Sequence, residues 1–299
     1  MQRRYVTIDV FTDRAFGGNP LAVVLDAEAL STAQMQAIAR EFNYSETTFV
    51  LPPADPAHTA RVRIFTPQSE LPFAGHPNVG TALVLARRAA VPPSRVLFEE
   101  GAGLVPLDIV LEGGAPASAE LTAPQPFARG SDAEPTELAV ALGLAASDLQ
   151  TETHLPTVGS VGLPFLFAEL AARAALSAAA PDPSRLPALL GAAGAVGVFL
   201  YTEEGVGAGF DLSARMFSPG IGEDPATGSA CVALAALLAG FGRPPDAEMV
   251  VRIAQGVDMG RPSLLRARAV KRGGAVVSAH VGGRGVEVMQ GSLFLAGEA

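Results

Sequence analysis

Cysteine is nearly absent from this sequence, since Cys231 is the single one among 299 residues. One cysteine excludes a disulfide framework and any metal site built from several thiolates. The four histidines, His58, His76, His154 and His280, are scattered and lack the spacing of metal ligands. The sequence therefore gives no reason to expect a metal, and nothing in it requires a cofactor.

Long runs of one residue type are also missing. No run of basic residues exceeds two, and the formal net charge is −9, which argues against a nucleic-acid groove. No apolar run reaches the roughly 20 residues that a membrane span needs. The N-terminal segment enters a strand pattern at once, without the apolar core of a signal peptide. We therefore expect a cytoplasmic protein whose partner is a small molecule.

The sequence does contain enough apolar residues, 49%, to bury the core of one large domain or two ordinary ones. Ser31 with Gln34 forms a capping box that predicts a helix over 32–42. Apolar patterns predict further helices over 76–90 and 228–240, while the segment 171–195 reads as irregular or short-helical. Most other segments read as strands with glycine turns, and few follow a strict βαβ order. This pattern favours an α+β fold with mixed or antiparallel sheets.

The chain repeats itself about half its length apart. The stretch RIFTPQSELPFAGHPNVGTALVLA (63–86) resembles RMFSPGIGEDPATGSACVALAALLA (215–239). The matched positions are Arg63 with Arg215, Phe65 with Phe217, Pro67 with Pro219, Glu70 with Glu223, Pro72 with Pro225 and Gly75 with Gly228. Both copies read as a strand, an acidic loop with proline, a glycine and an apolar helix. Two such copies predict two related domains with a pseudo-two-fold axis rather than a solenoid.

The segment EDPATGSA (223–230) shows what these helices offer. The helix that follows it has no charge in its first turns, and hydroxyls and a glycine lie at its start. Unpaired N–H groups and the positive end of the dipole at such a start attract an anion. The repeat predicts that two helix N-termini, one from each domain, hold a small carboxylate between them.

Six motifs in order resemble the phenazine-biosynthesis PhzF-like proteins. They are DVFTDRAFGGNPLAVVLDA, NYSETTFV, ELPFAGHPNVGTA, EDPATGSA, IAQGVDMGRPS and GVEVMQGSLFL. The resemblance implies the diaminopimelate-epimerase fold: two α+β domains, each a mixed sheet wrapped around a central helix, with the ligand between them. The domains would be 1–118 completed by 285–299, and 119–284. The resemblance also implies a homodimer.

The thiol epimerases of this fold use two cysteines, one before each interdomain helix. Ala74 and Thr227 stand at these positions, so a two-thiol mechanism is excluded. Cys231 lies further into its helix and is expected to be a buried apolar residue. The resemblance implies instead that Glu46, in the SET motif, moves the proton. Burial near a cleft would raise its pKa toward neutral, as a proton carrier requires.

The resemblance and the helix starts together predict the other site residues. His76 would donate to a substrate carboxylate or relay a proton, and Asp224 would orient a substrate amine or hydroxyl or share a proton. The expected substrate-binding residues are Asn19, Gly75, Gly228, Ser229 and Gly256. Arg261 is placed near the ligand by the family pattern, although it could equally well pin its loop.

The sequence thus predicts a cofactor-independent isomerase that moves a proton on a small carboxylate-bearing metabolite. Two alternatives stay open. One is an epimerase or racemase that uses Glu46 with His76 or Asp224 as the second base. The other is a non-catalytic metabolite-binding protein. Dinucleotide binding is a weaker alternative, because the glycines lack the strand and helix context of that motif.

Overall fold

The computed structural model describes residues 2–205, 207, 209–219, 221–241 and 244–295. The chain divides into two compact units, Met1–Thr122 with Gly282–Ala299, and Ala123–Val281. These boundaries lie a few residues from those expected from the sequence. The last strand, β18 (Ala275–Phe294), has residues in both units.

The first unit has eight further strands and two helices among its described residues. In chain order these are β1 (Gln2–Val10), β2 (Asn19–Val24), α1 (Thr32–Phe42), β3 (Glu46–Leu51), β4 (Ala60–Phe65), β5 (Glu70–Leu71), α2 (Gly75–Arg88), β6 (Arg95–Glu100), β7 (Gly103–Glu112) and β8 (Ala115–Thr122).

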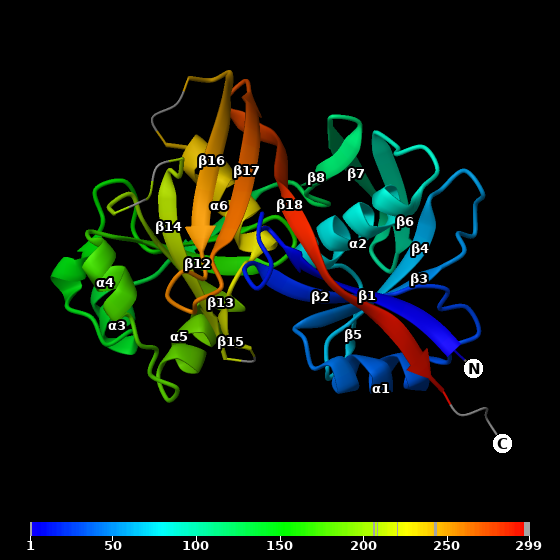
Figure 1. Cartoon of the computed structure of the whole chain (residues 1–299). Coiled ribbons are helices and arrows are strands. Elements are labelled where there is room, and N and C mark those ends of the chain that lie inside the picture. Colours follow the sequence, from blue (N-terminus) through cyan, green and yellow to red (C-terminus); the bar gives the residue numbers. More distant parts are fainter. Residues whose placement is uncertain (1, 206, 208, 220, 242–243, 296–299) are drawn as a thin grey trace. The chain divides into compact units, whose positions relative to one another are not determined.

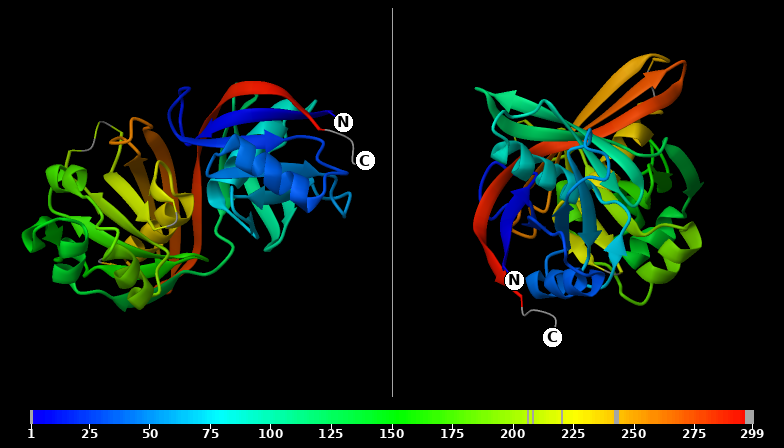
Figure 2. Two further views of the ribbon diagram at one scale, coloured as in Figure 1. Left: turned by 90° about the horizontal axis from the view of Figure 1, so that it is seen from below. Right: turned by 90° about the vertical axis from the view of Figure 1, so that its right-hand side faces the viewer.

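The sheet of this unit closes on itself around α2. Its strands pair in the order β18–β1–β2–β3–β4–β6–β7–β8, and β8 pairs with β18 again. The pairs β2–β3 and β4–β6 are parallel. Helix α2 packs against β1, β2, β3, β7 and β8, and Figure 1 shows it among these strands. The first and last strands, β1 and β18, lie side by side (Figure 2).

Helix α1 covers the outer face of the same sheet. Its capping box is formed as predicted, with Ser31 and Gln34 bonding each other's backbone N–H groups. The helix ends at Asn43, which adopts the left-handed conformation that asparagine tolerates. Its buried side chains pack with Phe49 and Phe65 of β3 and β4.

The second unit has shorter outer helices and one long inner helix. In chain order its elements are β9 (Ala128–Asp132), α3 (Pro135–Ala141), the 3₁₀ helix η1 (Ala146–Asp148), β10 (Leu149–Gln150), β11 (Thr157–Ser160), β12 (Pro164–Leu170), α4 (Arg173–Ala178), α5 (Leu186–Ala193), β13 (Gly197–Thr202), β14 (Leu212–Ser218), β15 (Gly222–Asp224), α6 (Gly228–Ala239), β16 (Ala247–Gln255) and β17 (Ser263–Arg272).

Its sheet runs β9–β11–β12–β13–β14–β16–β17, with the pairs β12–β13 and β14–β16 parallel. Helix α6 packs against β11, β12, β16 and β17. It carries no charged residue and is buried along nearly all its length, as expected of a helix that is apolar on every side. The segment 171–195 is short-helical as predicted, and with α3 it covers the outer face of the sheet.

The two units repeat one order of elements, so the sequence repeat is a repeat of structure. In both, a parallel pair of strands leads into an antiparallel strand, a short strand that folds back on it, the inner helix and a parallel strand. The short strands β5 and β15 were expected to be loop. They are only two and three residues long, so no alternating pattern marks them.

A matched arginine–glutamate pair holds each short strand. Arg63 bonds both carboxylate oxygens of Glu70 and lies over the ring of Phe65, 5.1 Å from its centroid. Arg215 bonds both oxygens of Glu223 and lies 4.7 Å from the centroid of Phe217. These residues are the ones that the sequence repeat aligns.

The two pairs differ in what else the guanidinium holds. Arg215 also donates from Nη1 to the carbonyls of Leu176, Ser177 and Ala179, at 2.9, 3.1 and 3.0 Å. It thereby satisfies carbonyls at the C-terminal end of α4, where a cation is favoured. Arg63 donates instead to the Thr32 hydroxyl at 3.0 Å.

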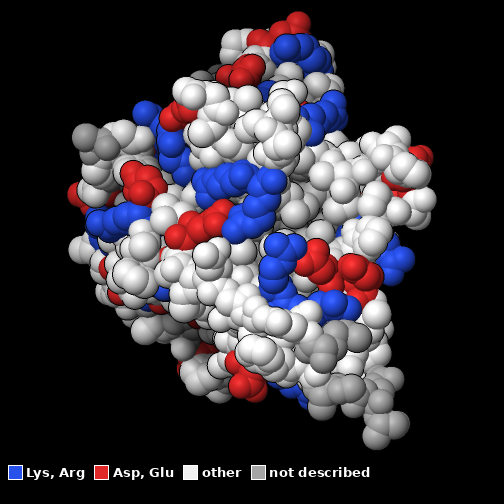
Figure 3. Space-filling view, turned by 45° about the vertical axis from the view of Figure 1, so that its right-hand side comes forward, with Lys and Arg blue, Asp and Glu red and all other residues white. Residues whose placement is uncertain are grey.

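No described helix is both long enough and apolar enough to cross a membrane. On the face shown in Figure 3, acidic and basic side chains lie next to one another.

The two arginines predict a graded loss of stability. Arg215→Met should lower the free energy of unfolding by about 3 kcal/mol, because it leaves a partly buried carboxylate and three carbonyls without their donor. Arg63→Met should lower it by about 1 kcal/mol or less, because its pair is more exposed. Urea unfolding followed by circular dichroism measures both. Equal losses would contradict the structural role given to Arg215.

Candidate functional site

In the first unit, Glu46 and His76 approach each other. Glu46 is the first residue of β3 and His76 the second residue of α2. The Nδ1 atom of His76 lies 3.5 Å from Oε2 of Glu46, and the two side chains are 7% and 12% exposed respectively. The structure thus brings together two of the predicted catalytic residues.

The start of β2 fixes this pair. Parallel pairing places Leu21 opposite Glu46, so the residues just before them are neighbours. The Ser45 hydroxyl donates to Oδ1 of Asn19 at 3.1 Å, and Asn19 is buried. An imidazole N–H of His76 donates to the carbonyl of Pro20. Asn19 therefore lies in the same group as Glu46 and His76, where it ties the strand that carries Glu46 to its neighbour.

Burial decides the charge of His76. The imidazole is surrounded by protein, which lowers its pKa to about 3, and the hydrogen bond to Pro20 opposes this only in part. His76 is therefore neutral near pH 7. Its Nε2 atom is buried and has no hydrogen-bond partner among the described residues. A neutral ring in this place can accept or relay a proton or bond a substrate.

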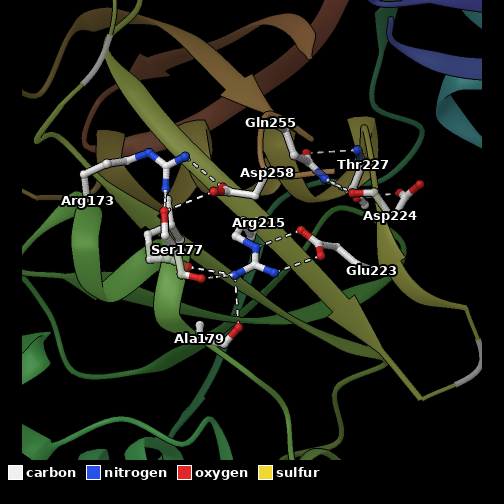
Figure 4. A network of polar contacts seen from close by, with 10 residues as sticks. Arg173, Ser177, Ala179, Arg215, Glu223, Asp224, Thr227, Gln255 and Asp258 are labelled. Atoms are coloured by element: carbon white, nitrogen blue, oxygen red, sulfur yellow. Dashed lines mark hydrogen bonds and ion pairs between the residues drawn. The ribbon is translucent and has the colours of Figure 1, made fainter. Parts of the chain in front are cut away.

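In the second unit, Asp224 ends β15 just before α6. It is 7% exposed, and the Thr227 hydroxyl donates to its Oδ2 atom at 2.6 Å. The side chain of Gln255 holds Thr227 in turn, donating to its hydroxyl at 3.0 Å and accepting its backbone N–H at 3.0 Å. Figure 4 shows the three side chains next to one another, joined by these hydrogen bonds.

Both inner helices begin without a side-chain cap. The N-cap residues are Ala74 and Thr227, and neither side chain bonds its helix. Neither first turn holds an acidic residue. By helix geometry, the N–H groups of Gly75, Gly228 and Ser229 have no acceptor within the helix. These helix starts are suited to bind an anion, as the sequence predicts, and substrate contact by the three residues stays a prediction.

Gly256 has a clear packing role. Its φ is +71°, and a Cβ there would lie 2.5 Å from the Arg261 carbonyl oxygen and 2.7 Å from that of Pro225. The N–H of Arg261 donates to the Gly256 carbonyl, closing a tight turn. The structure thus places both residues beside the Pro225 loop, whereas their contact with a ligand stays a prediction.

Cys231 is fully buried within α6, and burial raises the pKa of its thiol. This agrees with the apolar role predicted for it. Among the residues that the structure describes, no group of three or more histidine, cysteine, aspartate or glutamate side chains is arranged to hold a metal ion.

The predicted residues therefore form two groups. Glu46, His76, Asn19 and Gly75 belong to the first unit, and Asp224, Gly228, Ser229 and Gly256 belong to the second. Gln255, which holds both Asp224 and Thr227, was not predicted from the sequence. The only signal for it was its place immediately before Gly256 in the IAQGVDMGRPS motif.

Comparisons with known proteins agree on one family. The sequence pattern described as "Phenazine biosynthesis-like protein" matches residues 8–291. The trans-2,3-dihydro-3-hydroxyanthranilate isomerase of Pseudomonas aeruginosa is 40% identical over 98% of this chain and 99% of its own.

Solved structures agree on the fold. A PhzF-family phenazine biosynthesis protein of Bacillus anthracis superposes with a TM-score of 0.89 at 24% identity, over 99% of this chain and 100% of its own. A hydroxyproline epimerase of Agrobacterium vitis superposes with a TM-score of 0.63 at 14% identity, over 98% and 92%.

The buried neutral His76 predicts a pH-dependent stability. The folded-state pKa of about 3 lies below the ordinary value of 6.5, so between these values the unfolded chain binds the extra proton. The contribution of His76 to the free energy of unfolding is fully present above pH 6.5. It decreases as the pH falls, and about 2 kcal/mol is lost at pH 5. Urea unfolding at several pH values should show that His76→Asn lacks this part of the loss. Parallel stability curves for the two proteins would contradict a neutral buried His76.

Proposed function

Since this chain belongs to the family of phenazine biosynthesis-like proteins, we propose that it is an isomerase that moves a proton on a small carboxylate-bearing metabolite. The fold class and the enzyme class predicted from the sequence are confirmed by the relatives, which are named isomerases and share the fold. The proposal concerns the substrate class and the residues that carry the reaction.

The observation that carries the proposal is the nearly buried carboxyl group of Glu46 beside the neutral imidazole of His76, at the start of α2. A carboxylate in such a setting can take a proton from carbon, because it is partly desolvated and the imidazole beside it is neutral. The helix start beside it favours negative charge.

In the proposed reaction, the Glu46 carboxylate takes a proton from an acidic carbon of the substrate. The electron pair of the broken C–H bond spreads over the adjoining π-system, and the double bond shifts. The Glu46 carboxylic acid then returns the proton to another carbon of that system, on the same face. No electrons are gained or lost overall, and N–H groups at the helix starts would stabilise the charge that develops on the substrate.

We further propose that the residues of the second unit bind the same substrate. Gly228 and Ser229 would hold its carboxylate with backbone and hydroxyl donors, and Asp224 would orient an amine or hydroxyl. The relative named as acting on trans-2,3-dihydro-3-hydroxyanthranilate suggests a compound of this kind, with all three groups, as the first candidate.

The repeat favours one proton carrier over two. Thr47 lies opposite Phe65 and Val198 lies opposite Phe217, so the counterpart of Glu46 in the second unit is Gly197. A symmetric two-base epimerase would need an acid or base at both positions. An epimerase would therefore need His76 or Asp224 as its second base. A binding protein would give Glu46 no catalytic role.

A homodimer in the cytoplasm is part of the proposal as well. The resemblance to the family is its support, and light scattering of the purified protein at several concentrations tests the dimer.

The reaction predicts a measurable exchange of hydrogen. In D₂O, proton NMR should show solvent deuterium entering one carbon of trans-2,3-dihydro-3-hydroxyanthranilate or a related unsaturated carboxylic acid. Glu46→Gln should slow this by about 10²- to 10⁴-fold, the usual contribution of general acid–base catalysis. The exposed Glu41 of α1 provides a matched control, since Glu41→Gln should leave the rate unchanged.

The labelled carbon separates the alternatives. Deuterium at a new position on a shifted double bond supports isomerisation, whereas deuterium at an inverted stereocentre supports epimerisation. Equal exchange in wild type and Glu46→Gln would remove Glu46 from the mechanism. Tight binding of a carboxylic acid without any exchange would favour a binding protein.

A further inference from the structure

Gln255 is a fully buried polar residue at the end of β16. Its Oε1 accepts the N–H of Thr227 at 3.0 Å, and its Nε2 donates to the Asp224 carbonyl at 2.8 Å and to the Thr227 hydroxyl at 3.0 Å (Figure 4). One carboxamide thus holds both the last residue of β15 and the N-cap of α6.

The hydrogen bonds of Gln255 also fix the direction of the hydrogen bond between Thr227 and Asp224. The Thr227 hydroxyl has a single hydrogen, and since it receives a bond from Gln255 it gives that hydrogen to Asp224. The Asp224 carboxylate is therefore held by a donor whose own position is fixed from behind. A group at position 255 must offer a donor and an acceptor together, which a neutral carboxamide does and an ionised carboxylate does not.

Strand register assigns a counterpart in the first unit. In β14–β16, Ser213 pairs with Ala254 and Ala214 with Gln255. In β4–β6, Arg61 pairs with Glu99. The repeat aligns Arg61 with Ser213, at the same spacing as Arg63 with Arg215. Glu100 is therefore the counterpart of Gln255.

The glycines that follow support this alignment. A Cβ on Gly101 would lie 3.1 Å from the Cα of Pro72, and a Cβ on Gly256 would lie 3.0 Å from the Cα of Pro225. The two prolines are themselves matched by the sequence repeat. In both units the strand end thus passes closely under the loop that leads into the inner helix.

Glu100 is buried in a way that suits the neutral form. Both its carboxyl oxygens are buried without a hydrogen bond of normal geometry among the described residues. Burial raises the pKa of this carboxyl to about 8, and the nearby Asn78 amide, a neutral group on the first turn of α2, opposes the shift in part. Asn78 itself donates to the carbonyl of the N-cap residue Ala74 at 3.0 Å. In its neutral form Glu100 offers one O–H and one C=O, as Gln255 offers N–H and C=O.

We infer that Gln255 and Glu100 are equivalent positioning residues, which use a neutral head group to hold the N-terminal turns of α6 and α2 in the orientation that the substrate requires. Gln255 acts through Thr227 and Asp224, and Glu100 acts through the nearby Asn78 amide, which bonds the Ala74 carbonyl at the start of α2. The catalytic consequence of this inference rests on the proposed function. Its structural part rests on the hydrogen bonds of Gln255 and on the burial and strand register of Glu100.

Variants of Gln255 test the first half. Gln255→Met keeps the length of the side chain and removes both kinds of hydrogen bond, and it should lower kcat by about 10- to 100-fold, since small misplacements have effects of this size. KM should change less. The exposed Gln125 supplies the matched control, Gln125→Met, which should keep the wild-type kcat.

The conservative variant distinguishes positioning from mere packing. The titratable groups that face position 255 are Asp224 and Cys231, while the opposite residue on β17 is Ser263. Gln255→Glu should therefore work when its carboxyl is protonated and lose activity as the pH rises, because the ionised form cannot donate and repels Asp224. Gln255→Met should be impaired at every pH. Identical pH profiles for the two variants would overturn the inference.

Variants of Glu100 test the second half. If a neutral Glu100 positions the start of α2, wild-type kcat should fall as the pH rises through about 8, and Glu100→Gln should lack this alkaline fall. Glu100→Met should have lowered kcat throughout. An alkaline fall that persists in Glu100→Gln, or a Glu100→Met variant with the wild-type kcat, would overturn this half.

A measurement without turnover separates this inference from the proposed function. Hydrogen–deuterium exchange of the peptide covering 224–231 should be faster in Gln255→Met than in wild type, because the Thr227 N–H loses its acceptor. If Glu46→Gln is inactive while Gln255→Met keeps wild-type kcat and protection, the inference is wrong and the proposed function stands. If no acid is turned over but protection falls as expected, the proposed function fails and the structural role of Gln255 stands.

Discussion

The unpaired N–H groups at the starts of α2 and α6 are the constraint on which the rest of this structure depends. Each helix is enclosed by strands of its own unit, and neither is capped by its N-cap side chain. Buried N–H groups must find acceptors. Gln255 supplies one for Thr227, and the remaining donors of each first turn, which have no acceptor within the helix, are suited to bind an anion. The polar residues around each helix start hold its first turn in position.

In the second unit, a network of charged side chains connects α4 to the loops beside the start of α6. Arg173 and Ser177 of α4 bond Asp258, which lies within the turn from Gly256 to Arg261, and Arg215 joins α4 to Glu223 (Figure 4). Glu223 is the chain neighbour of Asp224. The segment 171–195, which has no functional pattern in the sequence, therefore ties down the two loops that flank the start of α6.

The sequence predicted the outer helix α1, the inner helices and the repeat because these rest on strong local signals. The capping box at Ser31 and the apolar run after Gly228 place helices with little help from the rest of the chain. The strands β5 and β15 were missed because short strands are defined by their partners. Gln255 was missed because a buried glutamine has no pattern of its own, and its importance follows only from the distances to Thr227 and Asp224.

The two copies of the repeat differ in which of their matched residues can gain or lose a proton. Where the first unit has Glu46, His76 and Glu100, the second has Gly197, Ser229 and Gln255. The first copy thus concentrates groups that gain or lose a proton, and the second replaces each of them with a group that does not titrate near neutral pH. The acid nearest its helix start, Asp224, accepts a hydrogen bond from the Thr227 hydroxyl. The repeated scaffold is in this way chemically asymmetric, which agrees with the single proton carrier proposed for the reaction.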